Sequence, residues 1–370
     1  MHIPDGYLSP TTCAGFYAGM TPVWATAGRA VRRVVRTRFV PLLALGASYS
    51  FLVMMFNVPV PDGTTAHAVG AVLVAILLGP WAAVVAVSIA LLIQALFFGD
   101  GGVLAYGANA WNMAFVMPMV GYGVYKLIAR RCPLTARRRA VAAGVASYVG
   151  LNASALFAAI ELGVQRDLFR SANGTPLYAP FPLWQTIPAM LLAHLLVAGV
   201  VEFALTFGVI SYLQRANLPV LRINHRGIAD RSPTRATAEP RSDSEPRPGP
   251  ASGPAPGTRP AWRWAVVGLA AMVVLTPLGL LAGGGAFGED APRDLDLRKY
   301  GLQGVPRGLA RYSGTWSRAV LDGYGFGSGS HPGVAYVLSA VVGLGAIGVI
   351  VFGGLGVGRV VSRRRSREVA

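Results

Sequence analysis

Charged residues are scarce in this chain. Of its 370 residues, 13% are charged and 53% are hydrophobic, and the mean hydropathy is +0.49, whereas a soluble domain carries about 25% charged residues. The runs 68–98 and 186–213 have almost no charge, and each exceeds the roughly 20 apolar residues that cross a bilayer. The composition therefore excludes an ordinary soluble domain and predicts an integral membrane protein.

Cysteine is rare, and no secretory leader is expected. The two cysteines, Cys13 and Cys132, fall near opposite membrane faces in the topology given below, so no disulfide is expected. A leader needs a basic stretch and an apolar core, but the first ten residues, MHIPDGYLSP, hold Pro, Asp and Gly there. Aminopeptidases that remove the initiator need a small second residue, and His2 is bulky, so we expect Met1 to be retained.

The apolar runs are continuous instead of alternating, which favours helices over a closed β-barrel. We therefore predict an all-α membrane protein with nine embedded segments. The third segment is short and precedes Gly79-Pro80, as expected of a partial or tilted span. The nine predicted segments are 12–30, 39–57, 67–79, 81–98, 108–130, 140–161, 184–214, 263–283 and 334–357.

Arginine is concentrated between these segments. Four blocks, at 29–38, 126–139, 215–263 and 359–367, hold 25 of the 33 basic residues and account for most of the net charge of +17. Nine crossings place all four blocks on one side, which is the cytoplasm by the positive-inside rule. This topology predicts a plasma-membrane protein with its N-terminus outside and its C-terminus inside. Contact with anionic lipid fits the blocks, and no nucleic acid is needed to explain them.

A change of composition divides the chain. Residues 216–262 are rich in Arg, Pro, Ser, Thr, Ala and Gly, a mixture that cannot bury a core and predicts a disordered cytoplasmic linker. The linker separates a seven-span unit at 1–215 from a two-span unit at 263–370. An outside loop at 284–333 joins the last two spans.

Three outside pieces interrupt the apolar sequence with Gly, Pro and Asp. They are MHIPDGYLSP at the start, NVPVPDGTTAHAVG at 57–70 and QALFFGDGGVLAYGANAWNM at 94–113. Non-helical backbone beside a membrane persists only where protein buries it or water reaches it. These pieces are therefore the expected place for a binding site.

The first two residues offer metal-binding nitrogens. The Met1 amine, the His2 backbone nitrogen and His2 Nδ1 can chelate one ion through fused rings. Square-planar bonding to Ni²⁺ or Cu²⁺ offsets the cost of deprotonating an amide; Co²⁺ uses such a set less favourably, and Zn²⁺ prefers a tetrahedron. His67 is the candidate for the fourth nitrogen, being the other histidine in the loops of the seven-span unit. The plain alternatives are a frayed terminus for His2 and a helix end facing lipid headgroups for His67.

MHIPDGYLSP, VPDGTTAHAVG with the following ILLGPWAAV, and QALFFGDGGVLAYGANAWNM resemble the signatures of one transporter family. They are similar to the nickel/cobalt substrate-binding (S) components of energy-coupling factor (ECF) transporters, the NikM/CbiM type. The resemblance covers about 1–215 and implies a metal held by the Met1 amine, the His2 amide and imidazole, and His67. It also implies a transmembrane coupling subunit and a pair of cytoplasmic ATPases as partners.

The region 263–370 resembles, more weakly, the small NikN/CbiN accessory subunit of the same transporters, fused here through the linker. The PDGLE string of that subunit is missing, and LDGYGF at 321–326 stands roughly where it would be. The resemblance implies a part in loading metal. We expect His331, which precedes Pro332, to be an interfacial residue; the alternative is that it passes metal along.

Several other polar residues lie near the loops or in the spans. Asn109 and Asn112 are candidates to orient a ligand imidazole by hydrogen bonds, the alternatives being helix capping and interhelical bonding. Direct metal binding is not expected of His194, which with Glu202 is predicted to satisfy polar neighbours or to contact a partner subunit. Gln94 is a further polar residue within a span. Aspartate is common in turns, so we predict turn residues instead of cation attractors at Asp5, Asp62 and Asp100.

The chain has no Walker A loop, because neither of its lysines, Lys126 and Lys299, follows Gly or precedes Ser/Thr. It is therefore predicted to be a non-enzymatic transport subunit that takes up Ni²⁺ or Co²⁺ as substrate and has no permanent cofactor. The alternative is an ECF-like carrier of a small organic solute such as a vitamin. An embedded enzyme lacks support from paired carboxylates or a nucleophile–base pair. The IPDG after Met1-His2 favours nickel, although four nitrogens suit both metals.

Overall fold

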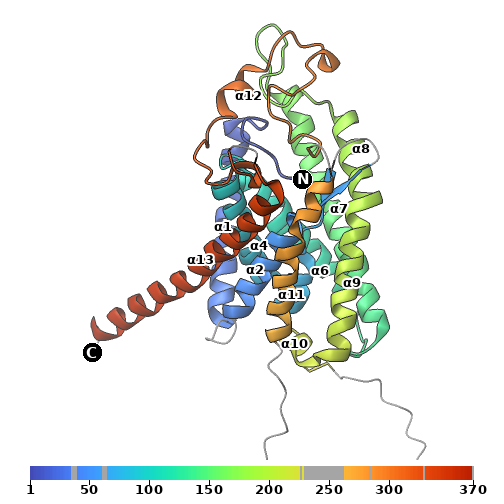
Figure 1. Cartoon of the computed structure of the whole chain (residues 1–370), viewed down its shortest axis with the longest axis vertical. Coiled ribbons are helices and arrows are strands. Elements are labelled where there is room, and N and C mark those ends of the chain that lie inside the picture. The colour runs from blue at the N-terminus through green and yellow to red at the C-terminus, as the bar shows by residue number, and fades with distance from the viewer. Residues whose placement is uncertain are drawn as a thin grey trace, which may run out of the picture.

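The structure is a computed structural model that describes residues 1–34, 40–60, 65–225, 227–228, 262–282, 285–327 and 330–368. These residues form a tall bundle of helices whose upper end in Figure 1 is covered by loops and short helices. The first helices of the bundle are α1 (Pro10–Val34), α2 (Val40–Met54), α3 (Ala71–Leu78) and α4 (Pro80–Phe98).

Helix α4 shows how the sequence sets these bounds. It begins with Pro80 in its first turn, where the missing N–H costs nothing, and ends before Gly99, whose φ of 66° is the left-handed conformation typical after a helix. The residues after Gly99 are therefore free to turn back across the top of the bundle.

The predicted third span is wrong at its beginning. Its helix begins at Ala71, and the residues before it form a short antiparallel hairpin of β1 (Asn57–Pro59) and β2 (Thr65–His67). His67 lies opposite Asn57 in this hairpin. The hairpin departs from an all-α fold and places His67 on a rigid strand instead of on a helix.

Two of the predicted spans contain a π-helical segment. One is built from α5 (Tyr106–Asn109), the π-helix η1 (Ala110–Val116) and α6 (Met117–Ile128). The other, beyond α7 (Arg137–Leu168), is built from α8 (Leu183–Ala193), the π-helix η2 (His194–Ala198) and α9 (Gly199–Ala216). Such segments are frequent at functional sites, and these two carry the buried polar residues Asn112 and His194.

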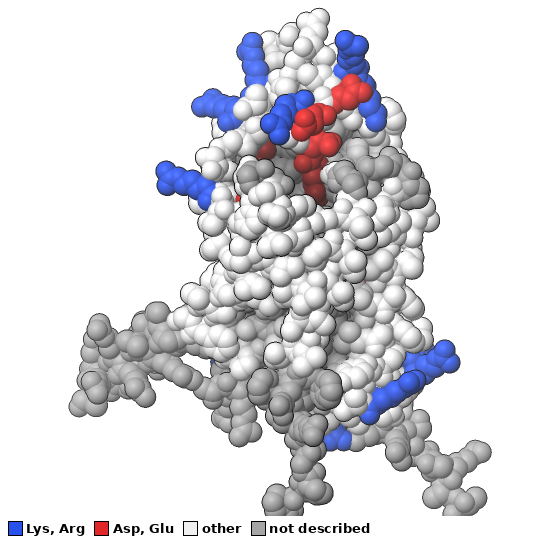
Figure 2. Space-filling view, viewed as in Figure 1, with Lys and Arg blue, Asp and Glu red and all other residues white. Residues whose placement is uncertain are grey.

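Four helical stretches of the described chain are long and apolar enough to cross a membrane: Pro80–Phe98, Arg137–Leu168, Leu183–Ala216 and Pro332–Gly353. The apolar stretches Val40–Met54 and Ala265–Leu281 are shorter. On the face drawn in Figure 2, a broad uncharged belt separates charged residues at the two ends. The apolar helices and this belt together indicate a membrane protein.

The first part of the predicted linker 216–262 contains a short helix. Helix α10 (Leu218–Arg222) and the residues after it pack on the lower end of the bundle. Asn224 Nδ2 donates to the carbonyls of Ala75 and Ile76 at 3.2 and 3.1 Å, and His225 Nε2 lies 2.9 Å from the Tyr125 hydroxyl. These contacts satisfy helix-end carbonyls and hold residues 218–225 on the bundle. Residues 229–261 of the predicted linker lie outside the described chain.

The C-terminal unit packs directly on the first unit. Its helix α13 (Pro332–Glu368) packs against α2 and α4, and Tyr336 donates to the Met55 carbonyl at 3.1 Å. Further along, α13 runs away from the bundle (Figure 1). Residues 285–327, which belong to the predicted outside loop 284–333, contain short helices and cover the end where the N-terminus lies. The remaining elements of this unit are α11 (Trp262–Leu275), η3 (Thr276–Leu281), η4 (Arg298–Tyr300), α12 (Arg307–Tyr312) and η5 (Asp322–Tyr324).

Candidate metal centre

The N-terminus is buried in the protein. Met1 is 1% exposed, His2 3% and Ile3 0%, so the alternative of a frayed terminus is wrong for His2. Asn109 holds this segment through a pair of hydrogen bonds, because its Oδ1 accepts from Ile3 N at 2.8 Å and its Nδ2 donates to Ile3 O at 3.0 Å. Asn109 thus fixes the backbone next to His2 instead of capping a helix or bonding an imidazole.

The loop after α4 approaches the N-terminal segment closely. Gly102 N donates to Ile3 O at 3.0 Å, and a Cβ on Gly102 would overlap the Asp5 carboxylate. Gly101 has φ +78° and lies against His2 and Asn109. Asp5 accepts from Ala105 N at 3.1 Å, so it joins the two loops, in agreement with the structural role predicted for it.

His67 presents one free nitrogen to the same place. It is 3% exposed, its Nδ1 lies 3.0 Å from the Ala68 carbonyl, and its Nε2 has no hydrogen-bond partner among the described residues. Donation from Nδ1 to that carbonyl leaves Nε2 with its lone pair. Burial lowers the pKa of the His67 imidazole well below its usual value, and the nearby Met1 amine lowers it further. His67 is therefore neutral near pH 7, as a metal ligand must be.

Glu202 fixes the turn that follows His67. Its carboxylate accepts from Val69 N at 2.8 Å and from Gly70 N at 3.1 Å. These two backbone N–H groups lie between β2 and α3, where no helix or strand supplies a hydrogen-bond acceptor, and Glu202 supplies one instead. Glu202 thus satisfies polar neighbours, as predicted for it.

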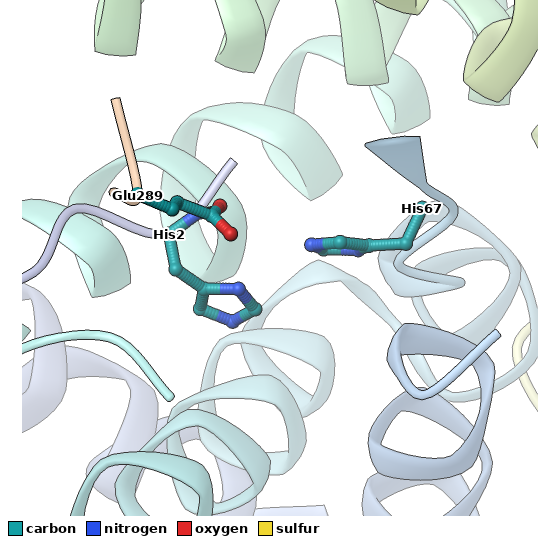
Figure 3. Close-up of side chains that lie close together, drawn as sticks. All are labelled: His2, His67 and Glu289. Carbon is teal, nitrogen blue, oxygen red and sulfur yellow. The ribbon is translucent and has the colours of Figure 1, made fainter. Parts of the chain in front are cut away.

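The imidazoles of His2 and His67 face each other. Their ring centroids are 5.0 Å apart with an interplanar angle of 29°, and Figure 3 shows both side chains pointing into one space. His2 Nδ1 lies 3.2 Å from Asp100 Oδ1, whereas His2 Nε2 has no partner among the described residues. Two buried nitrogens without partners on neighbouring rings are unusual for a core and suit a cation.

Glu289 completes the cluster from the C-terminal unit. One of its carboxylate oxygens accepts from the Met1 amine at 2.6 Å and from His2 N at 2.9 Å. Burial raises the pKa of this carboxyl, but the Met1 ammonium and His2 outweigh burial, so the pKa lies below its usual value. One ligand atom each from His2, His67 and Glu289 lies within 4.8 Å of the others. Sequence reasoning missed Glu289, because GED at 288–290 matches no motif.

Asp100 is more than a turn residue. Besides facing His2, its carboxylate accepts from the Tyr324 hydroxyl and, at 3.3 Å, from Gln94 Nε2. Tyr324 lies in LDGYGF, which docks on the end of α4 as Leu321 N donates to Phe97 O at 2.9 Å. The segment that stands in place of PDGLE therefore reaches the metal centre through Asp100.

The other candidates lie around or away from this cluster. Asn112 Nδ2 donates to Glu161 Oε2 at 2.8 Å, so it bridges helices and, like Asn109, forms no hydrogen bond to either imidazole within the described chain. His194 Nδ1 lies 2.7 Å from Met190 O, on a π-helix beside β2. His331 is exposed at the start of α13. Asp62 lies outside the described residues.

Comparison with known proteins places the chain in a family. The family model "Cobalt uptake substrate-specific transmembrane region" (CbiM) matches residues 2–219. The "Fused nickel transport protein NikMN" of Rhodobacter capsulatus is 45% identical over 94% of this chain and 95% of its own length. The "Probable fused nickel transport protein LarMN" of Lactiplantibacillus plantarum is 41% identical over 92% and 93%.

A solved structure agrees with these relatives. The crystal structure of a transition metal transporter superposes with a TM-score of 0.56 at 51% identity, covering 61% of this chain and all of that one. The two fused relatives span both units of the chain, so the likeness extends beyond the part that the family model matches. The chain therefore belongs to the CbiM family of substrate-specific transmembrane proteins, in the arrangement in which this unit is fused to a NikN-like one.

Proposed function

We propose that this chain captures Ni²⁺ or Co²⁺ outside the membrane as the substrate-binding component of an ATP-driven, ECF-type transporter. The observation that carries the proposal is the burial of the Met1 amine and two facing imidazoles at one point beneath the outer loops. Its family and its fused nickel-transport relatives support metal uptake.

The proposed ligands are four nitrogens, from the Met1 amine, the His2 amide, His2 Nδ1 and His67 Nε2. The amine and the amide are neighbours in the chain, and His67 Nε2 has no other partner within the described residues. Four nitrogens in a plane suit Ni²⁺ better than Co²⁺. Asn109 supports the set by fixing Ile3, whereas Asn112 supports the helices beneath it.

The proposed orientation places the metal centre outside. The described end opposite the metal centre shows only basic charge in Figure 2, whereas acidic and basic residues mix at the end with the loops. The positive-inside rule then makes the basic end cytoplasmic. Residues 1–215 act as the seven-span S component, 216–262 as a cytoplasmic linker whose residues 218–225 pack on the bundle, and 263–370 as the two-span accessory domain. A coupling subunit and two ATPases supply the energy to reorient the loaded component.

The rival function, a carrier for an organic solute such as a vitamin, fits the centre less well. Such a solute needs an aromatic or polar cavity of several hundred Å³. At this centre the ligand atoms of His2, His67 and Glu289 lie within 4.8 Å of one another. That spacing matches a single ion.

The test is equilibrium dialysis of the full chain, with a native N-terminus, against Ni²⁺, Co²⁺ and thiamine. We expect both metals to bind and thiamine not to bind. One extra residue before Met1 removes the amine from the chelate and should abolish high-affinity metal binding. A control with one alanine inserted within 229–261 changes the chain length equally and should bind normally. High-affinity nickel binding by the extended variant would refute the four-nitrogen site.

A further inference from the structure

The nitrogens proposed for Met1 and His2 are all engaged by carboxylate oxygens. One oxygen of Glu289 accepts hydrogen bonds from both the Met1 amine and His2 N, and Asp100 Oδ1 lies 3.2 Å from His2 Nδ1. An oxygen that accepts from both the amine and the amide lies in the space where an ion bound to these nitrogens would sit. Glu289 must therefore move before the ion can take its final place.

The same carboxylate completes a different ligand set. His2 Nε2 and His67 Nε2 are buried without partners among the described residues. In Figure 3 the His67 side chain points toward Glu289, and the His2 ring lies below the Glu289 carboxylate. Two imidazoles and a carboxylate are a common ligand set for divalent ions of this series, with water at the open positions. This set needs no deprotonated amide, so an ion can bind to it before the His2 amide loses its proton.

The three side chains differ in how exposed they are to solvent. The Glu289 side chain is 21% exposed, whereas His2 and His67 are 3% exposed. The Glu289 side chain is therefore the most accessible of the three to an ion arriving from outside.

We propose that Glu289 is a metal ligand supplied by the C-terminal unit, which with His2 and His67 forms a capture site for the incoming ion. The inference rests on the proposed function and assigns the order of binding at the same centre. The ion then exchanges the Glu289 oxygen for the Met1 amine and the His2 amide, whose protons pass to water. His2 turns Nδ1 from Asp100 to the ion in that step.

Docking of the C-terminal unit holds the capturing carboxylate in place. Tyr7 donates its hydroxyl proton to the backbone carbonyl of Asp290 at 2.7 Å, directly beside Glu289. Tyr324, farther along the same unit, bonds to Asp100. The accessory unit therefore contributes both a ligand and a contact that orients His2.

The experiment uses the full chain and two probes, Zn²⁺ and Ni²⁺, with a metallochromic indicator reporting the free ion. Zn²⁺ prefers tetrahedral imidazole and carboxylate ligands and reports on the capture site. The colour and diamagnetism of square-planar Ni²⁺ report on the final site. Glu289→Gln keeps an oxygen for both N–H donors but removes the charge. Asp290→Asn is the matched control, since it removes a charge from the adjacent residue.

We expect Glu289→Gln to weaken Zn²⁺ binding at least about tenfold, because even groups that only support a ligand are worth 10–100-fold. Ni²⁺ capture should slow to a similar extent, while the square-planar complex still forms at equilibrium. Asp290→Asn should match the wild type, and Glu289→Asp should recover part of the Zn²⁺ affinity.

Two results would overturn the capture site. The first is wild-type Zn²⁺ affinity and Ni²⁺ capture rate in Glu289→Gln, and the second is equal behaviour of the Gln and Asp variants. The proposed function would stand in either case. Failure of the wild type to form a square-planar Ni²⁺ complex would instead refute the four-nitrogen site itself.

Discussion

The two units of the chain contribute different atoms to the proposed metal centre. Residues in the first unit contribute nitrogens on buried, firmly held backbone, with Asn109 fixing the terminus and Glu202 fixing the turn after His67. The C-terminal unit contributes an oxygen from Glu289, on a partly exposed loop. Nitrogens on rigid elements suit tight final binding, and an oxygen at the surface suits rapid exchange.

Replacing His67 by alanine is expected to have the largest effect, because it removes a ligand from both proposed sites. Nickel affinity should fall at least about 100-fold, because loss of a ligand costs more than loss of a residue that only hydrogen-bonds to a ligand. Titration against a competing chelator measures it. His331→Ala removes an exposed histidine and should leave the nickel affinity unchanged. Equal losses of nickel affinity in the two variants would contradict the different roles assigned to the two units.

Replacing Asn109 by alanine tests the rigidity of the first unit. The change leaves the buried N–H of Ile3 unpaired, at a cost of about 1–3 kcal/mol, and should release the N-terminal segment. We expect weaker nickel binding and a lower thermal unfolding temperature. The exposed Asn173→Ala should show neither change. Nickel binding unaltered by Asn109→Ala would mean that the terminus needs no such anchor.

Asp100 lies at the junction of the two units, where it faces His2 and accepts from Tyr324. Asp100→Asn removes the charge that orients the His2 imidazole, so Zn²⁺ affinity should fall about tenfold. Calorimetry of Zn²⁺ binding measures the change. Asp322→Asn, an exposed carboxylate beside Gly99, is the matched control, and a loss as large in the control would point to general charge instead of orientation.

Tyr324→Phe should have the smallest effect, because it removes only the hydroxyl that bonds to Asp100. A hydrogen bond of this kind contributes about 0.5–1.5 kcal/mol, which corresponds to a factor of roughly 2–10 in Zn²⁺ affinity. Tyr336→Phe removes a hydroxyl that bonds to Met55 O and should leave Zn²⁺ binding unaffected. A loss larger than that of Asp100→Asn would show that Tyr324 acts by another route.

The long apolar helices could be predicted from the sequence, because they depend on local pattern. The structure also brings together His2 and His67, which the sequence motifs singled out. Long apolar runs determine α4, α7 and the α8–α9 stretch, and the motifs around His2 and His67 are specific. The β1–β2 hairpin was missed because three-residue strands leave no alternating pattern. Residues 218–225 were assigned to the linker by composition, although Asn224 and His225 find partners on the bundle.

Glu289 and the second role of Asp100 could not be predicted for a different reason. Glu289 lies 288 positions from Met1 along the chain, and Tyr324 lies 224 positions from Asp100. The neighbouring glycines predict a turn residue at Asp100. Its partner Tyr324, which gives it a further role, lies in the C-terminal unit. Contacts of this kind are set by tertiary packing, which local sequence does not encode.

The ion pair between Met1 and Glu289 also joins residues that lie 288 positions apart along the chain. Its formation closes a loop that runs from the first unit to the C-terminal unit. The N-terminal segment therefore gains its last partners only when the C-terminal unit has folded onto it.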